Sequence, residues 1–146
     1  IRSSFVMSGF TTAGVVVSDS TLDVVYSTLG AMNANALYCE GAFTTNVRNS
    51  FLVRSQSSPA VSCDGATFET SAAPETLDGT ANVELPAFST AWFANYGGGD
   101  LSLTASAPDE LLTAAVWLAG DPSVDFHGDA RPNVEGTADA AGADLP

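Results

Sequence analysis

The chain has 146 residues and is strongly acidic, with 17 aspartates and glutamates against 4 basic residues, all arginine. A chain of this length holds one hydrophobic core, so we expect one structural domain. The net charge of −13 leaves no basic stripe to neutralise phosphates, which argues against nucleic acid and against an anionic membrane surface as partners. No apolar run reaches the roughly 18 residues of a membrane span, so we expect no membrane insertion.

The first 76 residues repeat with a period of about 22 to 24 residues. Cys39-Glu40-Gly41 returns as Cys63-Asp64-Gly65, and a second alignment matches IRSSFV (1–6) with VYSTLG (25–30) and VRNSFL (47–52). Apolar residues alternate over short runs between glycines, serines, asparagines and aspartates, which is typical of short strands and turns. The period predicts an all-β solenoid of stacked parallel strands, a β-helix.

The repeat also predicts which residues lie on adjacent coils. Two columns are expected, Val15 with Leu37 and Val61, and Val17 with Cys39 and Cys63. Leu22 and Val24 fall out of phase with Phe43 and Val47, so we expect a bulge or slipped turn in that coil.

The two cysteines occupy equivalent positions in this repeat. On adjacent coils their Cα atoms would lie near 5 Å apart, within the roughly 4.4 to 6.8 Å that a disulfide needs. A Cys39–Cys63 bridge is therefore predicted. The alternative is that both are reduced and pack as small apolar side chains.

The remaining chain carries several short motifs. They are Trp92-Phe93, Gly99-Asp100-Leu101, Ala107-Pro108, Asp125-Phe126, Gly128-Asp129, Arg131-Pro132 and Gly142-Ala143-Asp144. In this order they resemble the C-terminal end of bacterial secreted right-handed parallel β-helix proteins of the pectate-lyase-like superfamily. The repeat predicts stacked coils over residues 1–76, starting within a coil. The resemblance implies the last coil or coils with an irregular capping tail over residues 77–146.

Asp121, Asp125 and Asp129 surround His127 in the sequence and form a candidate calcium site, because carboxylates at alternate positions suit that ion. The alternative is that these aspartates cap turns and that Asp125 or Asp129 pairs with Arg131. We expect no other cofactor.

Catalytic constellations are harder to find, and no catalytic residue is predicted. His127 is the one histidine and has no serine near it in the sequence, which argues against a triad. Glu40 and Asp64 would stack as a carboxylate pair for glycoside hydrolysis, but each precedes a glycine and suits a turn. Arg48 and Arg54 would serve lyase chemistry if they shared a face.

The aromatic residues after position 85 are candidates for a cap. Trp92, Phe93, Tyr96 and Trp117, with Arg131, would cover the apolar end of the last coil, or alternatively form a sugar-binding platform. Residues 111–118 are expected to form a short helix or an extended run.

The sequence therefore favours a non-catalytic structural or interaction module of an extracellular or cell-surface protein, involved in adhesion, assembly or filament formation, whose secretion signal is not part of this chain. The alternative is a fragment of a polysaccharide lyase or glycosidase with its catalytic coils upstream. Ile1 and Phe5 lie on an open coil edge, which we expect to pair with preceding coils or with a second copy, and polysaccharide is a further candidate partner.

Overall fold

The computed structural model describes residues 1–9, 13–55 and 59–145, and in these ranges the fold is all-β. Short 3-10 helices interrupt the strands after residue 89. Within the described ranges, no helix has the length and apolar character needed to cross a membrane.

Three parallel sheets are built from the first 84 residues. The five-stranded sheet contains, in spatial order, β1 (Phe5–Ser8), β4 (Thr28–Ala31), β7 (Phe51–Arg54), β10 (Ala72–Ala73) and β12 (Val83–Glu84). The four-stranded sheet contains β3 (Thr21–Val25), β6 (Thr44–Arg48), β9 (Thr67–Glu69) and β11 (Gly79–Thr80). The three-stranded sheet contains β2 (Val15–Ser18), β5 (Leu37–Glu40) and β8 (Val61–Ser62).

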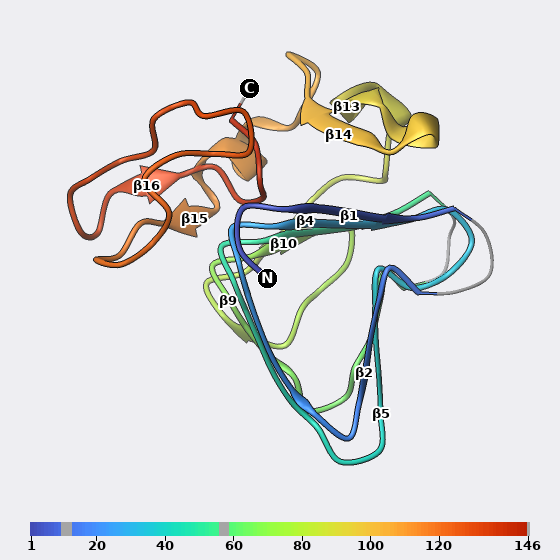
Figure 1. The fold of residues 1–146 in the computed structure, drawn as a ribbon. Coiled ribbons are helices and arrows are strands. Elements are labelled where there is room, and N and C mark those ends of the chain that lie inside the picture. The colour runs from blue at the N-terminus through green and yellow to red at the C-terminus, as the bar shows by residue number, and fades with distance from the viewer. Residues whose placement is uncertain (10–12, 56–58, 146) are drawn as a thin grey trace.

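The chain visits the three sheets in turn. β1, β2 and β3 make one circuit, and β4, β5 and β6 pair with them in parallel on the next. Figure 1 shows these circuits superimposed along three sides of a triangle. Each circuit thus buries its inward side chains against those of its neighbours.

The register confirms the predicted columns, with Val17 opposite Cys39 in the second one, and corrects the second alignment of the repeat. Val15 pairs with Leu37 and Leu37 with Val61, as expected. The second alignment is wrong by one residue, because Phe5 pairs with Thr28 and Thr28 with Phe51. The expected bulge is also wrong, since β3 and β6 pair without interruption and Val24 lies opposite Val47.

One corner of the triangle explains the true spacing. Ser3, Tyr26, Asn49 and Thr70 all have positive φ angles, of 41°, 48°, 53° and 46°. At this corner each of these circuits therefore turns with a non-glycine residue in the left-handed region, where asparagine is favoured and most other residues are strained. Tyr26 is therefore equivalent to Asn49, whereas the predicted alignment of residues 25–30 with 47–52 places Ser27 opposite Asn49.

Serines follow these corners and form an internal ladder. The Ser27 N–H donates to Ser50 Oγ at 3.2 Å, and the Ser50 N–H donates to Ser71 Oγ at the same distance. Each hydroxyl in turn donates to the carbonyl two residues earlier, as from Ser50 to Arg48 O at 2.8 Å. These bonds satisfy backbone groups where the chain leaves the sheet.

Two apolar clusters fill the molecule because alternate strand residues point to opposite faces. Leu29 and Leu52 point inward, into a cluster enclosed by the three sheets. Phe51 and Val53 point outward and pack beneath the C-terminal segment.

The C-terminal segment, residues 85–145, lies against the outward face of the five-stranded sheet (Figure 1). Its elements are η1 (Thr90–Trp92), β13 (Phe93–Asn95), η2 (Tyr96–Gly98), β14 (Asp100–Leu103), η3 (Asp109–Thr113), β15 (Ala115–Val116) and β16 (Ala138–Asp139). β13 pairs with β14 and β15 with β16, both antiparallel. Residues 111–118 thus combine both expected forms, a helical turn and a short strand.

Candidate functional site

The two ends of the parallel sheets differ in how far their strands extend. At one end lie β1, β2 and β3, which we call the long-strand end, with four, four and five residues. At the other lie β12, β8 and β11, the short-strand end, with two residues each. Among the described residues, each of these six strands has a strand neighbour on one side.

The long-strand end leaves part of the inner core uncovered. Val6, Val15 and Leu22 are half-buried, whereas their partners on the next circuit are fully buried. Those partners are Leu29, Leu37 and Thr45, with exposures of 0%, 0% and 2%. Long strand edges over an incompletely covered core form a surface on which another strand can pair.

The predicted edge residues have separate environments. Ile1 is 40% exposed, and its ammonium group donates to Asp23 O at 2.7 Å. Phe5 is half-buried because it points outward from β1 and stacks on Phe126, with ring centroids 4.2 Å apart. The C-terminal segment thus contacts the flank of β1.

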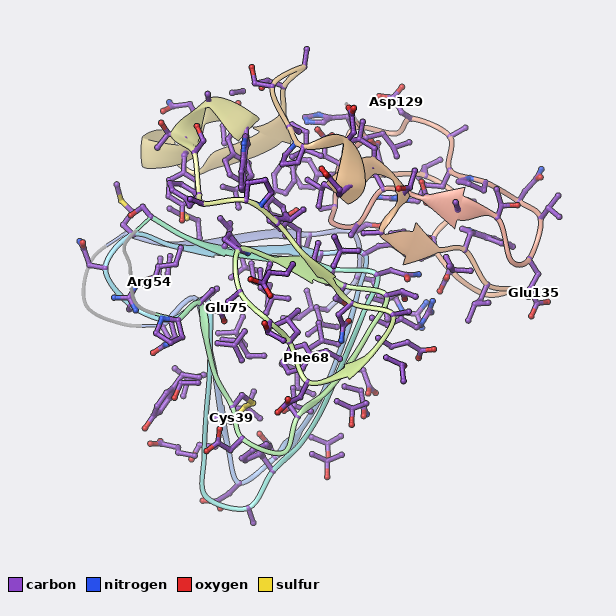
Figure 2. The ribbon with its side chains drawn as sticks, turned by 180° about the vertical axis from the view of Figure 1, so that it is seen from behind. Cys39, Arg54, Phe68, Glu75, Asp129 and Glu135 are labelled. Atoms are coloured by element: carbon purple, nitrogen blue, oxygen red, sulfur yellow. A yellow bond between two sulfur atoms is a disulfide. The ribbon has the colours of Figure 1, made fainter. Side chains whose placement is uncertain are left out.

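Side chains cover part of the short-strand end, where Val61 stays half-buried. Leu77 is 8% exposed and joins the inner cluster. Both carboxylate oxygens of Glu75 accept backbone hydrogen bonds, from Ala60 N at 2.8 Å and Val61 N at 2.9 Å. Glu75 and Phe68 lie near this end in Figure 2.

The predicted disulfide is confirmed. Cys39 and Cys63 are bonded, with Cα atoms 4.6 Å apart, and the bridge lies beside the Cys39 label in Figure 2. Glu40 and Asp64, which follow the cysteines, are exposed, and Gly41 and Gly65 have positive φ angles. This geometry fits the turn role of these residues.

The carboxylates of Asp121 and Asp125, two of the candidate calcium ligands, are hydrogen-bonded to other protein groups and do not converge on one metal position. The Asp121 carboxylate accepts hydrogen bonds from both terminal nitrogens of Arg48 and from Leu118 N, the last at 2.8 Å. Asp125 accepts the N–H groups of His127 and Asp129, which is the turn-capping role. Within the described ranges, no group of three or more His, Cys, Asp or Glu residues is arranged to hold a metal ion.

Burial and hydrogen bonding oppose each other at these aspartates. Burial raises the pKa of Asp121, but the Arg48 guanidinium and the Leu118 N–H outweigh it, so the pKa lies below its usual range. For Asp125, burial is likewise outweighed by backbone N–H donors, those of Leu145 first, and the pKa is lowered. Both carboxylates are therefore held in their charged form.

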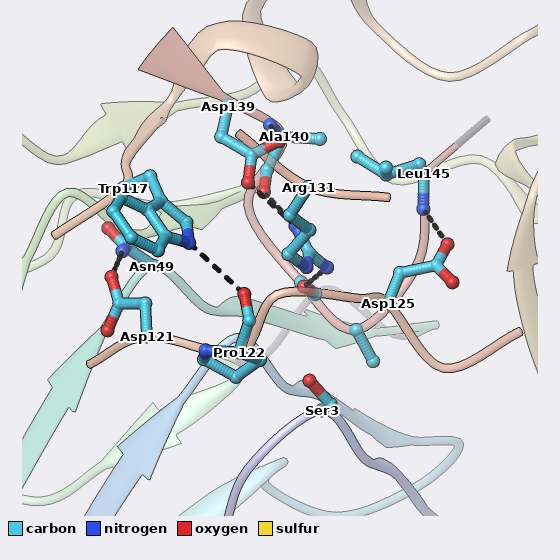
Figure 3. A network of polar contacts seen from close by, with 12 residues as sticks. Ser3, Asn49, Trp117, Asp121, Pro122, Asp125, Arg131, Asp139, Ala140 and Leu145 are labelled. Atoms are coloured by element: carbon cyan, nitrogen blue, oxygen red, sulfur yellow. Dashed lines mark hydrogen bonds and ion pairs between the residues drawn. The ribbon is translucent and has the colours of Figure 1, made fainter. Parts of the chain in front are cut away.

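Asn49 connects the corner to the C-terminal segment. Its side chain donates to Val116 O at 2.8 Å and accepts from Val116 N at 3.2 Å and from Thr70 Oγ1 at 2.5 Å. Figure 3 shows Asn49 beside Asp121 and Trp117, whose indole N–H donates to Pro122 O at 3.1 Å.

Arg131 pairs with Asp139 and not with Asp125 or Asp129, which corrects the expected partner. Its Nη1 lies 3.0 Å from Asp139 Oδ2, and its Nη2 donates to Gly142 O at 2.8 Å (Figure 3). The guanidinium stacks over Tyr26, 4.2 Å from the ring centroid. Arg131 therefore fixes the tail onto a corner of the parallel sheets.

The aromatic residues are mainly packing residues, but not at the end of the coils. Trp92, Phe93 and Tyr96 are 6%, 4% and 3% exposed, and Phe93 stacks on Phe51 at 5.6 Å. Phe51 belongs to β7, the central strand of the five-stranded sheet. The expected cover of the last coil is thus a cover of one flank, and their burial argues against a sugar platform. The Tyr96 hydroxyl donates to Ala31 O at 2.7 Å, and burial raises the pKa of Tyr96 to about 12.

Sequence reasoning missed the surroundings of His127. Its Nε2 lies 2.8 Å from Ser102 Oγ and 3.5 Å from Asp144 Oδ1. Because serine and aspartate approach the same ring nitrogen, the arrangement is not that of a triad, in which they hold opposite nitrogens. Burial raises the pKa of Asp144, and nearby Asp125 adds to this effect. No repeat or motif signalled these contacts across the chain.

No protein-family model matches the chain, and no curated protein or solved structure shows significant similarity to it.

Proposed function

We propose that the chain is a structural and interaction module: a right-handed parallel β-helix whose long-strand end pairs with a further turn of parallel strands. The three-sheet topology and the regular register support the β-helix. Parallel strands joined by crossovers are right-handed in nearly all proteins, which supports the handedness.

The difference between the two ends is the observation that carries this proposal. Proteins commonly protect a sheet edge by keeping its strand very short or by covering it. The short-strand end has two-residue strands and the cover of Leu77 and Glu75, with Val61 half-buried there. At the long-strand end β1, β2 and β3 are longer, and Val6, Val15 and Leu22 are all half-buried. β1 and β2 also carry no charged residue and no proline.

The partner that fits this end is a β-helix coil with three parallel strands and apolar inward residues. Such a coil continues all three sheets at once and covers the half-buried side chains. A preceding coil of the same fold meets these requirements, because it repeats the relation between β1–β3 and β4–β6.

An extracellular or cell-surface location is part of the proposal. Disulfides persist mainly in oxidising compartments, and the Cys39–Cys63 bridge therefore supports an extracellular or cell-surface location. The resemblance of residues 77–144 to secreted parallel β-helix proteins points the same way.

An added coil tests the interface directly. A copy of residues 24–46, with alanine in place of its cysteine, is fused ahead of Ile1 so that its strands align with β1, β2 and β3. We expect a higher Tm and slower amide exchange in β1 than in the parent chain. The matched control carries serine at the copies of Leu29 and Leu37, and we expect it to give neither effect.

Two results would overturn the proposal. Equal Tm values for the matched and serine-bearing fusions would show that no specific pairing occurs. Concentration-dependent dimerisation of the parent chain, abolished by the added coil, would make a second copy the occupant instead of a preceding coil.

One groove favours the alternative, a carbohydrate-active protein. A hollow of about 330 Å³ on the outward face of the four-stranded sheet is lined by polar groups that include Arg2, Asp23, Asn46, Arg48 and Glu69. Arg54 lies on β7, in another sheet, so the expected arginine pair does not share this face. Retention on immobilised acidic polysaccharide, with release of unsaturated or reducing products, would establish this alternative.

A further inference from the structure

The backbone around β2, β5 and β8 repeats one hydrogen-bonding arrangement. Gly14 N and Val15 N donate to Asn35 O and Ala36 O of the next circuit, at 2.9 and 3.0 Å. One circuit later, Ala36 N and Leu37 N both donate to Ala60 O, at 2.6 and 3.2 Å. Each pair of N–H groups is therefore satisfied by carbonyl oxygens of the circuit that follows.

The third pair of N–H groups meets a side chain instead. Ala60 and Val61 are equivalent to Gly14 and Val15, and their N–H groups donate to Glu75 Oε2 and Oε1 at 2.8 and 2.9 Å. The two carboxylate oxygens thus occupy the place of the next circuit's carbonyls. A charged acceptor makes stronger hydrogen bonds than a neutral carbonyl, so a competing strand is at a disadvantage there.

We propose that Glu75 is a built-in stop that prevents a second copy of the chain from stacking on the short-strand end. With the carboxylate in place, the β8 edge has no free donors at Ala60 and Val61 to offer. Without it, these donors face a position that β2 of a second copy can occupy where the long-strand end of that copy is not already paired with a further coil. This inference rests on the proposed function for the identity of the end that docks.

Closure of one end determines what kind of assembly is available. Two different ends that pair head to tail produce open filaments, whereas a single competent end produces at most closed dimers. Glu75 therefore limits an interface that would otherwise repeat without end.

The test compares Glu75→Ala with Glu110→Ala, which removes the same charge at an exposed position on η3. At low protein concentration we expect the Ala60 and Val61 amides to exchange about tenfold or more faster in Glu75→Ala only. At high concentration we expect its mass by light scattering to grow progressively and the two amides to regain protection. Glu110→Ala should behave as the parent chain does.

A second variant identifies the docking end. Adding Leu22→Lys to Glu75→Ala places a charge on the uncovered core of the long-strand end, and we expect it to stop the growth. If the Glu75→Ala chain unfolds, the same measurements are made on Glu75→Gln, which keeps one acceptor oxygen and the side-chain length.

The outcomes separate this inference from the proposed function. If Glu75→Ala shows fast exchange at Ala60 and Val61 but keeps a monomeric mass at all concentrations, the proposal that Glu75 prevents stacking is wrong. The added-coil fusion would still test the long-strand end by itself. Unchanged exchange at Ala60 and Val61 would overturn it as well. Growth that persists with Leu22→Lys would show that the short-strand end pairs without the long-strand end.

Discussion

Phe5 on β1 and Phe126 in the C-terminal segment stack with their ring centroids 4.2 Å apart and an interplanar angle of 26°. The contact joins the first strand of the parallel sheets to a loop near the other end of the chain. Two nearby bonds support it, from Arg2 Nη1 to Gly120 O at 3.0 Å and from Ser3 Oγ to Val124 O at 3.5 Å. The C-terminal segment thus stabilises the long-strand end from its flank and leaves the strand edge itself accessible.

Removing either ring should weaken this attachment. We expect Phe5→Ala and Phe126→Ala each to lower the free energy of unfolding, with a coupling of about 0.5 to 1.5 kcal/mol between them in a double-mutant cycle. Chemical denaturation of the four proteins measures it. Val134→Ala, at a residue 65% exposed, serves as the control and should change stability by less than about 0.5 kcal/mol. Additive effects of the two phenylalanine variants would show that the stack contributes nothing.

The strand class and part of the register could be predicted from the sequence because they depend on local patterns. The recurrence of cysteine, acidic residue and glycine located the disulfide and the Val15–Leu37–Val61 column. The serine ladder is also encoded locally, since Ser4, Ser27 and Ser50 recur at an even spacing, but the predicted alignment lies one residue away from this spacing.

Long-range packing could not be predicted in this way. The corner residue Tyr26 carries a side chain that gives no sign of a left-handed turn, so its equivalence to Asn49 was hidden. Trp92, Phe93 and Tyr96 are buried in a cover, but composition does not distinguish the end of a stack of coils from its flank. Ser102 and Asp144 meet His127 only because the tail folds back, and no spacing encodes that.

Loss of the disulfide should reduce stability without changing the fold. The bridge closes a loop across a sequence separation of 24 residues, for which chain-entropy reasoning gives about 3 to 4 kcal/mol. We expect the Cys39→Ser/Cys63→Ser double variant to lose about this much in urea denaturation. Addition of reductant should destabilise the parent chain by a similar amount and leave the double variant unaffected. A reductant effect on the double variant would show that the stabilisation has another origin.

Asn49 should be among the least replaceable residues. Asn49→Ala removes four side-chain hydrogen bonds and places alanine, which tolerates the left-handed region less well than asparagine, at φ 53°, so we expect a loss of about 3 to 4 kcal/mol. Asn49→Gly loses the same bonds but tolerates the backbone angle, and should cost about 1 kcal/mol less. Asn46→Ala, at an exposed asparagine bonded to Asp23, should cost less than about 1 kcal/mol. Equal losses for the Ala and Gly variants would argue against strain at this corner.

The Arg48–Asp121 pair should make stability depend on pH in the acid range. The Asp121 side chain is 2% exposed and its pKa is lowered, so the pair contributes stability above the unfolded pKa of about 3.9 and loses it as pH falls through the folded value. Arg48→Met leaves a buried carboxylate without its cation, and we expect a cost of about 2 to 3 kcal/mol at pH 7.

That cost should shrink as the pH falls from about 5 to 3, because a protonated Asp121 no longer needs a cation. Arg54→Met is the matched control, since Arg54 donates to Pro59 O and has no carboxylate partner among its described contacts. The stability cost of Arg54→Met should be the same at about pH 5 and about pH 3. Adding Asp121→Leu to Arg48→Met should recover most of the loss at pH 7, because no buried charge remains. A cost of Arg48→Met that does not vary with pH would assign the arginine a packing role instead of an electrostatic one.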